Sequence, residues 1–275
     1  MRIGILPVWV MAILTASVCA QPAGSELVKA ELLADVAQIE PGKPFTVGVL
    51  LKIAPQWHVY WKNPGDGGAP TRLQFKLPSG FSVGEINYPV PVQFEQPGNI
   101  VGYGYEDEVM LTATITPPKT LKPGASVSLQ AGASWLVCHD VCIMGSKDLR
   151  LELPVAETAQ PANQELFQQW AQRMPSRQPM ISVEPYKGGA DEKVIVRVEL
   201  DQPREVEWFP GPPDHFDLED VETAQEGNVA IMRFRPEPAV KGSVLFPILV
   251  AYTDEQGQRR GVEQEVEIGK MKLQR

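Results

Sequence analysis

The stretch SVSLQAGASWLV, Ser126–Val137, decides the fold, because every second side chain in it is apolar. These apolar residues are Val127, Leu129, Ala131, Ala133, Trp135 and Val137. Successive side chains of a β-strand point to opposite faces of a sheet. The alternation therefore predicts a strand with one face buried against a core and the other face polar.

Three more stretches between residues 21 and 156 alternate in the same way. They are FTVGVLLKI at 45–53, VMLTATI at 109–115 and LRLELPV at 149–155. Sequences typical of turns separate them, among them EPGKP, NPGDGGAP, LPSG and KPGA. Short strands at this spacing predict an antiparallel sandwich of immunoglobulin-like size over residues 21–156.

The pattern changes to a helical spacing between residues 157 and 179. Its apolar positions are Leu166, Phe167, Trp170 and Met174. Asn163 precedes them as a candidate N-cap, and Pro175 follows. We expect a short amphipathic helix that connects two domains and packs its apolar stripe on a neighbouring domain.

Strand alternation returns over residues 180–275, in KVIVRVEL, VAIMRFRP, SVLFPILVAYTD and GVEQEVEIG. This alternation predicts a second β-sandwich, in which we find no motif that suggests catalysis or ligand binding. The predicted fold class is thus all-β, with two immunoglobulin-like antiparallel β-sandwiches joined by a short helical connector. The 26 prolines and 23 glycines agree with short strands and tight turns. A net charge of −9 without a run of Lys or Arg argues against a nucleic-acid partner.

The N-terminus, MRIGILPVWVMAILTASVCA, is typical of a secretory signal peptide over residues 1–20. An apolar run follows Arg2, and the small residues Val18 and Ala20 occupy the −3 and −1 places of a cleavage site. Retention as a membrane anchor and lipidation of Cys19 are the alternatives. Pro7 argues against the anchor, and the residues before Cys19 match a lipidation site poorly. We expect an exported protein, soluble after cleavage.

Cleavage would leave two cysteines, Cys138 and Cys142. Four residues of extended strand span about 13 Å, well beyond the roughly 7 Å that a disulfide tolerates between Cα atoms. A bond between the two cysteines therefore requires the chain to fold back, with His139 to Val141 at the turn. Because Val137 belongs to the core-facing set, we expect Cys138 to point the other way, near solvent.

The spacing of the cysteines leaves three hypotheses open. A structural disulfide closing so short a loop would contribute roughly 2 kcal/mol. A short, accessible disulfide is also easily reduced, which suits a redox pair, and a neighbouring His139 could stabilise its thiolate. Finally, thiolate and thioether ligands suit Cu(I). The candidate metal ligands are Cys138, His139, Cys142 and Met144.

The aromatic residues around position 60 have a structural explanation. Trp57, Val59 and Trp61 share one parity, so we expect them to fill the core of the first sandwich. An exposed platform that stacks on sugars is the alternative.

Three segments, taken in order, resemble the N-terminal periplasmic domain of the DsbD family of thiol:disulfide interchange proteins. They are WHVYWKNPGDGGAPT at 57–71, YPVPVQFEQPGNIVGYGYEDEVML at 88–111 and WLVCHDVCI at 135–143. The resemblance covers about residues 27–155. It is strongest to the branch that includes the suppressor-of-copper-sensitivity membrane reductases.

This resemblance implies a redox-active pair, Cys138 and Cys142, in an immunoglobulin-like fold without a cofactor. Cys142 matches the cysteine that forms the mixed disulfide with partners. The family also shields its pair with a cap loop, here QFEQPGNIVGYGYED with Phe94 as the lid. The residues that the resemblance places in the cap loop or beside the pair are Phe94, Glu95, Tyr103, Tyr105, His139 and Asp140.

The function that the resemblance implies is electron relay in the periplasm, as a thiol:disulfide oxidoreductase. The donor would be a membrane-embedded thiol reductase, and the acceptors periplasmic thioredoxin-like or disulfide isomerase proteins. Copper tolerance and cytochrome c biogenesis are the implied settings. Full-length members continue into a transmembrane carrier and a thioredoxin-like domain, which we do not find in this sequence, so we expect a separate electron source. A copper-binding or purely structural module is the alternative.

Overall fold

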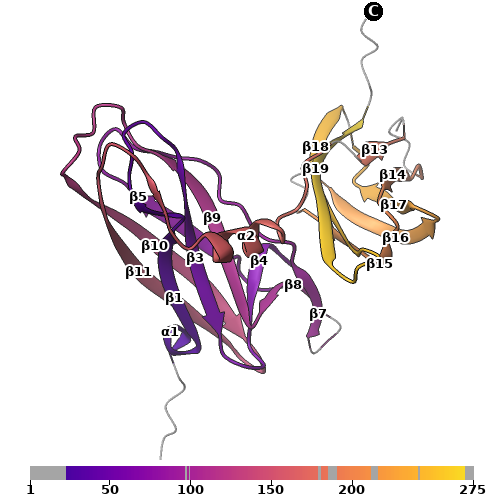
Figure 1. Ribbon diagram of the computed structural model, residues 1–275. Helices are drawn as coiled ribbons and strands as arrows, with labels where there is room; N and C mark the ends of the chain where they lie inside the picture. The colour runs from indigo at the N-terminus through magenta and orange to yellow at the C-terminus, as the bar shows by residue number, and fades with distance from the viewer. Residues whose placement is uncertain are drawn as a thin grey trace, which may run out of the picture.

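The computed structural model describes residues 23–96, 98, 100–178, 181–184, 191–211, 216–240 and 242–269. The expected signal peptide lies outside the described residues. Strands dominate, and they gather into two β-sandwiches joined through a short helix (Figure 1). The predicted all-β, immunoglobulin-like fold class is thereby confirmed. We call the unit built from β1 to β11 the first sandwich, and the unit built from β13 to β19 the second sandwich.

The first sandwich has two main antiparallel sheets. One contains, in spatial order, β1 (Val28–Ala34), β3 (Phe45–Ile53), β9 (Glu108–Thr116) and β6 (Ser82–Val83). The other contains β11 (Cys142–Pro154), β10 (Ser126–Cys138), β4 (His58–Gly65), β8 (Ile100–Glu106) and β7 (Val92–Gln96), with β5 (Arg72–Lys76) also paired to β10. The short helix α1 (Gly24–Leu27) precedes β1, and β2 (Val36–Gln38) pairs with β12 (Gln160–Pro161).

The core of the first sandwich follows the predicted alternation. All six apolar positions of β10 are buried, and the residues between them, Ser128 to Leu136, are exposed or half-buried. Strand β3 departs from strict alternation, because Leu50 is buried together with Val49 and Leu51. Burying each large aliphatic side chain contributes about 1.5–3 kcal/mol, so the facing sheets are held together mainly by these residues.

The second sandwich is smaller and also antiparallel. One sheet contains β13 (Ile181–Val183), β14 (Val194–Glu199), β17 (Val229–Glu237) and β16 (Asp217–Glu226). The other contains β15 (Arg204–Pro210), β18 (Ser243–Thr253) and β19 (Arg259–Gly269). Valines of β14 pack against Phe234 and Phe246, whose ring centroids lie 5.6 Å apart.

The connector helix is α2 (Gln164–Ala171), which ends before Met174. Asn163 does not cap it as predicted: its backbone is left-handed, and its side chain instead donates to the Ala34 carbonyl at 2.8 Å. Trp170 is buried in the core of the first sandwich, and Arg173 lies 4.4 Å over its ring. The apolar stripe of the helix therefore packs on the first sandwich, as expected.

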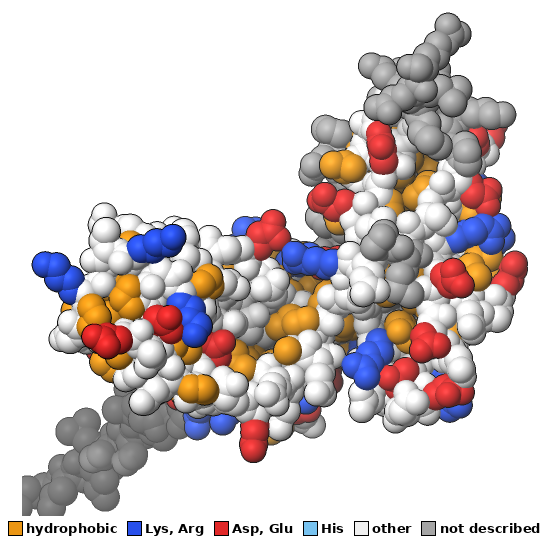
Figure 2. All heavy atoms as spheres, turned by 45° about the horizontal axis from the view of Figure 1, so that its top comes forward, with side chains coloured by type: hydrophobic (Ala, Val, Ile, Leu, Met, Phe, Trp, Pro, Cys, Tyr) orange, Lys and Arg blue, Asp and Glu red, His pale blue; other side chains and the backbone are white. Residues whose placement is uncertain are grey.

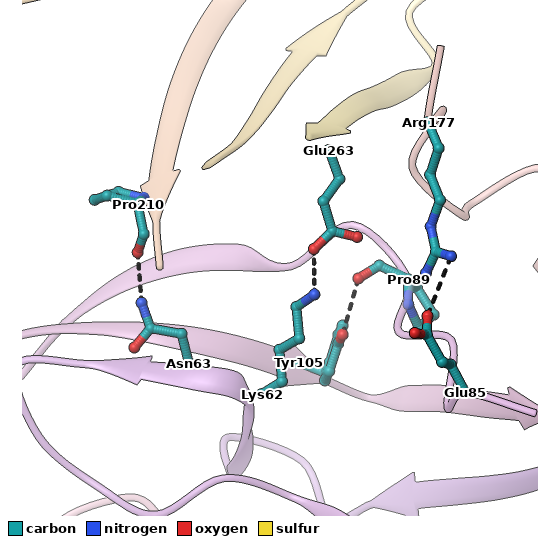
Figure 3. Close-up of polar contacts among 8 residues, drawn as sticks. All are labelled: Lys62, Asn63, Glu85, Pro89, Tyr105, Arg177, Pro210 and Glu263. Atoms are coloured by element: carbon teal, nitrogen blue, oxygen red, sulfur yellow. Dashed lines mark hydrogen bonds and ion pairs between the residues drawn. The ribbon is translucent and has the colours of Figure 1, made fainter. Parts of the chain in front are cut away.

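The two sandwiches are in direct contact and meet at an angle, as the space-filling view shows (Figure 2). Four polar contacts at and beside this junction are drawn in Figure 3. Across the junction, Lys62 pairs with Glu263, and Asn63 donates to the Pro210 carbonyl at 2.5 Å (Figure 3). Beside it, Arg177 of the connector pairs with Glu85 of the first sandwich at 3.4 Å (Figure 3). Apolar contact accompanies them, because Phe209, Leu249 and Ala251 of the second sandwich belong to the core of the first.

Within the described ranges, the structure contains no helix of the length and apolar character that a membrane crossing needs.

Removing the buried ring of the connector helix tests how firmly the helix holds to the first sandwich. We expect Trp170→Ala to lower the free energy of unfolding by about 3–5 kcal/mol, because the truncation leaves a cavity in the core. Chemical denaturation measures the change. Gln168→Ala, on the exposed side of the same helix, is the control and should change stability by less than about 0.5 kcal/mol. Equal effects of the two substitutions would contradict the packing described.

Candidate redox site

The hairpin of β10 and β11 brings the two cysteines together. Its pairing places Cys138 directly opposite Cys142, with Cα atoms 4.2 Å apart, and the two residues form a disulfide. His139 to Val141 make the turn, closed by a hydrogen bond from the His139 amide to the Val141 carbonyl at 3.2 Å. The chain thus folds back at the point where a bond between these cysteines requires it.

The two cysteines differ in exposure. Cys142 is exposed, whereas Cys138 is 0% exposed. This corrects the expectation that Cys138 lies near solvent. The alternation argument fails because the outer face of the sheet is covered at this point. Cys138 pairs with His58 of β4, and the ring of Phe94 lies against that of His58, with centroids 4.0 Å apart and planes tilted by 40°.

Phe94 belongs to the hairpin of β7 and β8, which we call the cap. Two glycines of β8 let its ring lie close to the backbone. A Cβ added at Gly102 would fall 2.2 Å from the Phe94 ring, and one at Gly104 would fall 2.1 Å from the Val59 carbonyl oxygen. Real Cβ atoms do not approach so closely, so these glycines allow the cap to close over the site.

A polar chain links the cap to the exposed sulfur. The Gln96 amide nitrogen lies 3.1 Å from Nε2 of His58 and donates to the Tyr60 hydroxyl at 2.7 Å. That hydroxyl lies 4.0 Å from the Cys142 Sγ. A disulfide sulfur carries no hydrogen, so Tyr60 is the donor in this long contact. The chain therefore runs from Gln96 through Tyr60 to Cys142.

His58 and Tyr60, the two titratable groups beneath the cap, are uncharged at neutral pH. Burial, and to a lesser degree the charge of His139, lowers the pKa of His58 from 6.5 to about 4. Burial also raises the pKa of Tyr60 above its ordinary value of 10, and the hydrogen bond from Gln96 opposes this shift. His58 is thus a neutral acceptor, and Tyr60 retains the proton that it offers to the sulfur.

The turn residues lie beside the site but outside the cap. His139 is exposed, with its Nδ1 3.1 Å from an Asp140 carboxylate oxygen and its ring 5.9 Å from that of Trp57. Of the alternative metal ligands, Met144 is 85% exposed, and both cysteine sulfurs are engaged in the disulfide. Across the described part of the chain, no three His, Cys, Asp or Glu side chains gather in a way that could hold a metal ion.

The expected cap residues divide into two groups. Phe94 lies over the site, whereas Glu95, the next residue along β7, is exposed. Tyr103 and Tyr105 do not face the disulfide. Because Gly102 and Gly104 face Phe94, strand alternation turns these tyrosines to the other side, where Tyr103 contacts Phe209 of the second sandwich at 5.0 Å. Tyr105 is buried and donates to the Pro89 carbonyl at 2.8 Å (Figure 3).

Sequence reasoning missed three residues of the site: His58, Tyr60 and Gln96. Val59 and Trp61 are buried in the core as expected, while Trp57 is only half-buried. Strand alternation in the sequence could have identified His58 and Tyr60. They alternate with these core residues and so point to the face opposite the core. Gln96 lies within the stretch that the resemblance assigns to the cap loop, but nothing in the sequence distinguished it from its neighbours.

Comparison with known proteins supports the sequence resemblance. Residues 25–154 match the family described as the N-terminal domain of the thiol:disulfide interchange protein DsbD. The fold is similar to the N-terminal periplasmic domain of ScsB from Proteus mirabilis, at 18% identity and a TM-score of 0.62, over 87% of this chain and 92% of that one. The reduced N-terminal domain of DsbD from Neisseria meningitidis aligns at 11% identity and a TM-score of 0.31, over 50% of this chain and 93% of that one. No curated protein sequence matches the chain.

The depressed pKa of His58 predicts a pH-dependent stability. Between pH 6.5 and 4 the unfolded chain binds a proton at this residue and the folded chain does not. The stability that His58 contributes is therefore complete above pH 6.5 and is lost as the pH falls toward 4, by at most about 1.4 kcal/mol per pH unit. Urea denaturation at several pH values measures this slope.

The matched variants for this measurement are His58→Gln and His139→Gln. The first should flatten the pH dependence between pH 6.5 and 4, whereas the second removes only the smaller, electrostatic contribution to the His58 shift and should leave most of the slope in place. An unaltered slope in His58→Gln would show that His58 is not held neutral in the folded protein.

Proposed function

We propose that this chain is a thiol–disulfide exchange module whose reacting groups are Cys138 and Cys142, because residues 25–154 match the family of DsbD N-terminal domains. The observation that carries the proposal is the asymmetry of the disulfide: Cys142 is exposed, and Cys138 is buried beneath a cap. A purely structural crosslink gains nothing from such an arrangement, whereas an exchange reaction needs one accessible sulfur and one protected sulfur.

The proposed reaction is a two-step exchange that begins with the reduced pair. The Cys142 thiolate attacks a disulfide of the partner, forming a mixed disulfide and releasing one partner sulfur as a thiolate. Cys138, deprotonated in turn, then attacks the Cys142 sulfur and displaces the second partner sulfur. Two electrons pass to the partner, and the Cys138–Cys142 bond closes. Reduction by an upstream dithiol runs the same steps in reverse.

Tyr60 suits the role of a hydrogen-bond donor to the reacting sulfur. Its hydroxyl is kept protonated by burial and is oriented by Gln96. When Cys142 is a thiolate, donation from Tyr60 favours the charged form and lowers the thiol pKa. His58 is not a source of positive charge at neutral pH, because its own pKa is about 4. The thiolate is thus supported by a neutral donor rather than by an imidazolium beneath the cap.

The cap accounts for protection between encounters. Phe94 and Gln96 lie over the pair, in contact with His58 and Tyr60. A partner would gain full access to Cys138 only when the cap opens, as lids in other enzymes do on binding. Closure would therefore limit reaction of the reduced pair with unrelated oxidants.

The exposed side chains beside Cys142 favour brief docking of another protein. Val141 is 45% exposed and Met144 is 85% exposed, and they flank Cys142. Apolar side chains on a surface are typical of protein contacts, and flexible methionine adapts to different partners. We propose periplasmic thioredoxin-like or disulfide isomerase proteins as acceptors and a membrane-embedded thiol reductase as the donor. Export by a signal peptide over residues 1–20, and roles in copper tolerance or cytochrome c biogenesis, belong to the same proposal.

Serine substitutions test the two cysteine roles separately. We expect Cys142→Ser to abolish electron transfer, because it removes the attacking sulfur. Cys138→Ser should accumulate stable mixed disulfides, because no thiol remains to resolve them. Incubation with an oxidised thioredoxin-like protein, followed by non-reducing electrophoresis, distinguishes these results. The double serine variant is the control for non-covalent association.

Two results would contradict the proposed function. One is a Cys138→Ser variant that traps no thioredoxin-like protein while the unsubstituted chain transfers electrons to it. The other is a disulfide that stays oxidised in buffers poised below about −300 mV, as structural disulfides do. The proposal expects a reversible couple between about −180 and −270 mV, the range of exchange proteins.

Removing the Tyr60 hydroxyl should make Cys142 a weaker acid. In the Cys138→Ser background we expect Tyr60→Phe to raise the pKa of the Cys142 thiol by about half a unit to one unit, the value of one hydrogen bond. The pH dependence of alkylation by iodoacetamide reports this pKa. Tyr88→Phe is the control, since that hydroxyl donates to the Thr71 carbonyl. Identical alkylation profiles for both variants would rule out donation from Tyr60 to the sulfur.

A further inference from the structure

The second sandwich holds the cap at its base. Arg259, the first residue of β19, donates from Nε at 3.2 Å and from Nη2 at 2.7 Å to the carbonyl oxygen of Pro91. Pro91 immediately precedes β7, the strand that carries Phe94. Two donors of one guanidinium on one carbonyl fix the position of that peptide, and hydrogen bonds from charged groups are stronger than neutral ones.

Arg259 is itself held in place. Its guanidinium pairs with Glu207 of β15 and lies 5.9 Å from the ring of Phe209. Phe209 reaches across the junction and is fully buried, with its ring 5.0 Å from Tyr103 and 6.2 Å from Trp61. Tyr103 lies opposite Gln93 in the pairing of β7 with β8. The second sandwich thus contacts β8 of the cap and the residue that leads into β7.

The segment leading into β7 is fixed at each of its three residues. Pro89 accepts a hydrogen bond from Tyr105 (Figure 3), and the amide of Val90 donates to the Arg173 carbonyl at 2.9 Å. Gly261 of β19 lies against Val90 so closely that an added Cβ would fall 2.6 Å from a Val90 methyl group. Pro91 is the third residue, bound by Arg259.

The tip of the cap is held differently from its base. Phe94 lies three residues beyond Pro91, about 10 Å along the strand. Over the disulfide, the tip rests on aromatic contact with His58 and on hydrogen bonds from Gln96. The base is anchored to another sandwich, so the position of the second sandwich determines where the tip can rest.

We propose that the second sandwich is a positioning element for the redox site, and that Arg259 is the positioning residue that keeps the cap closed over the Cys138–Cys142 disulfide. This inference rests on the proposed function of that pair and assigns a regulatory role to a part of the chain that has no reacting group of its own. A protein that binds the second sandwich and displaces Arg259 would change the reactivity of the disulfide without touching either sulfur.

The test is the rate at which dithiothreitol reduces the disulfide in the full chain, followed by the release of free thiols. We expect Arg259→Met to react roughly threefold to tenfold faster than the unsubstituted chain, because loss of hydrogen bonds of this strength favours the open cap. Arg260→Met is the matched control. Arg260 bonds to Asp254 and Gln258, both in the second sandwich, so its loss should leave the rate unchanged.

A double-mutant cycle separates positioning of the cap from general destabilisation. Phe94→Ala removes the lid and should accelerate reduction in its own right. If Arg259 acts through the cap, adding Arg259→Met to Phe94→Ala gives no further acceleration. Arg259→Lys keeps a cation beside Glu207 but loses the paired donors, and its rate should fall between those of the unsubstituted chain and Arg259→Met. Thermal unfolding confirms that each variant is folded.

The outcomes distinguish this inference from the proposed function. An accelerated Phe94→Ala with an unchanged Arg259→Met overturns the role of Arg259 and leaves the exchange function standing. Full additivity of the two substitutions also overturns it, because Arg259 would then act elsewhere. If Phe94→Ala itself reacts at the unsubstituted rate, the cap does not protect the disulfide, and both the protective role of the cap and this inference fail.

Discussion

The site depends on the unbroken antiparallel pairing of β10 with β11. The register runs from Ser126 opposite Pro154 to Cys138 opposite Cys142 without a shift. A slip of one residue would turn each side chain of a strand to the other face and separate the sulfurs. The register is secured far from the sulfurs, by the buried face of β10 in the core. The core packing that stabilises the sandwich therefore also fixes the geometry of the cysteine pair.

Features that depend on one strand alone could be predicted from the sequence, whereas features that depend on the order of several strands could not. The alternation around Leu129 and Trp135 is a local property, and it predicted the strand, its buried face and the fold class. The cover around Cys138 is not local: Cys138 pairs with His58 of β4, and His58 contacts Phe94, which precedes Cys138 by more than forty residues. These residues come together only through the order of strands in the sheet. Single-strand parity assigned Cys138 to the correct face but could not show that this face is covered.

The same distinction applies to the remaining site residues. Strand alternation places His58 and Tyr60 on the face opposite the core. Their partner Gln96 lies on a different hairpin, so these hydrogen bonds could not be predicted without the order of the strands. Tyr103 shares a segment with Phe94 yet serves the contact with the second sandwich, because two glycines fix which face of β8 receives the Phe94 ring. A family resemblance locates a segment, whereas strand alternation decides which of its side chains reach the sulfur.

The packing of α2 has a consequence for how the molecule moves in solution. Trp170 fixes the connector to the first sandwich, and residues beyond it run beside β19 of the second, where Ser176 exchanges backbone hydrogen bonds with Gly261 and Glu263 at 2.8 Å. Little free tether remains between the two halves. We therefore expect the rotational diffusion of the two sandwiches to be coupled. Under the proposed function, a partner protein would then meet Cys142 at a fixed position relative to both sandwiches, and the shape of the whole chain would restrict which proteins can reach the sulfur.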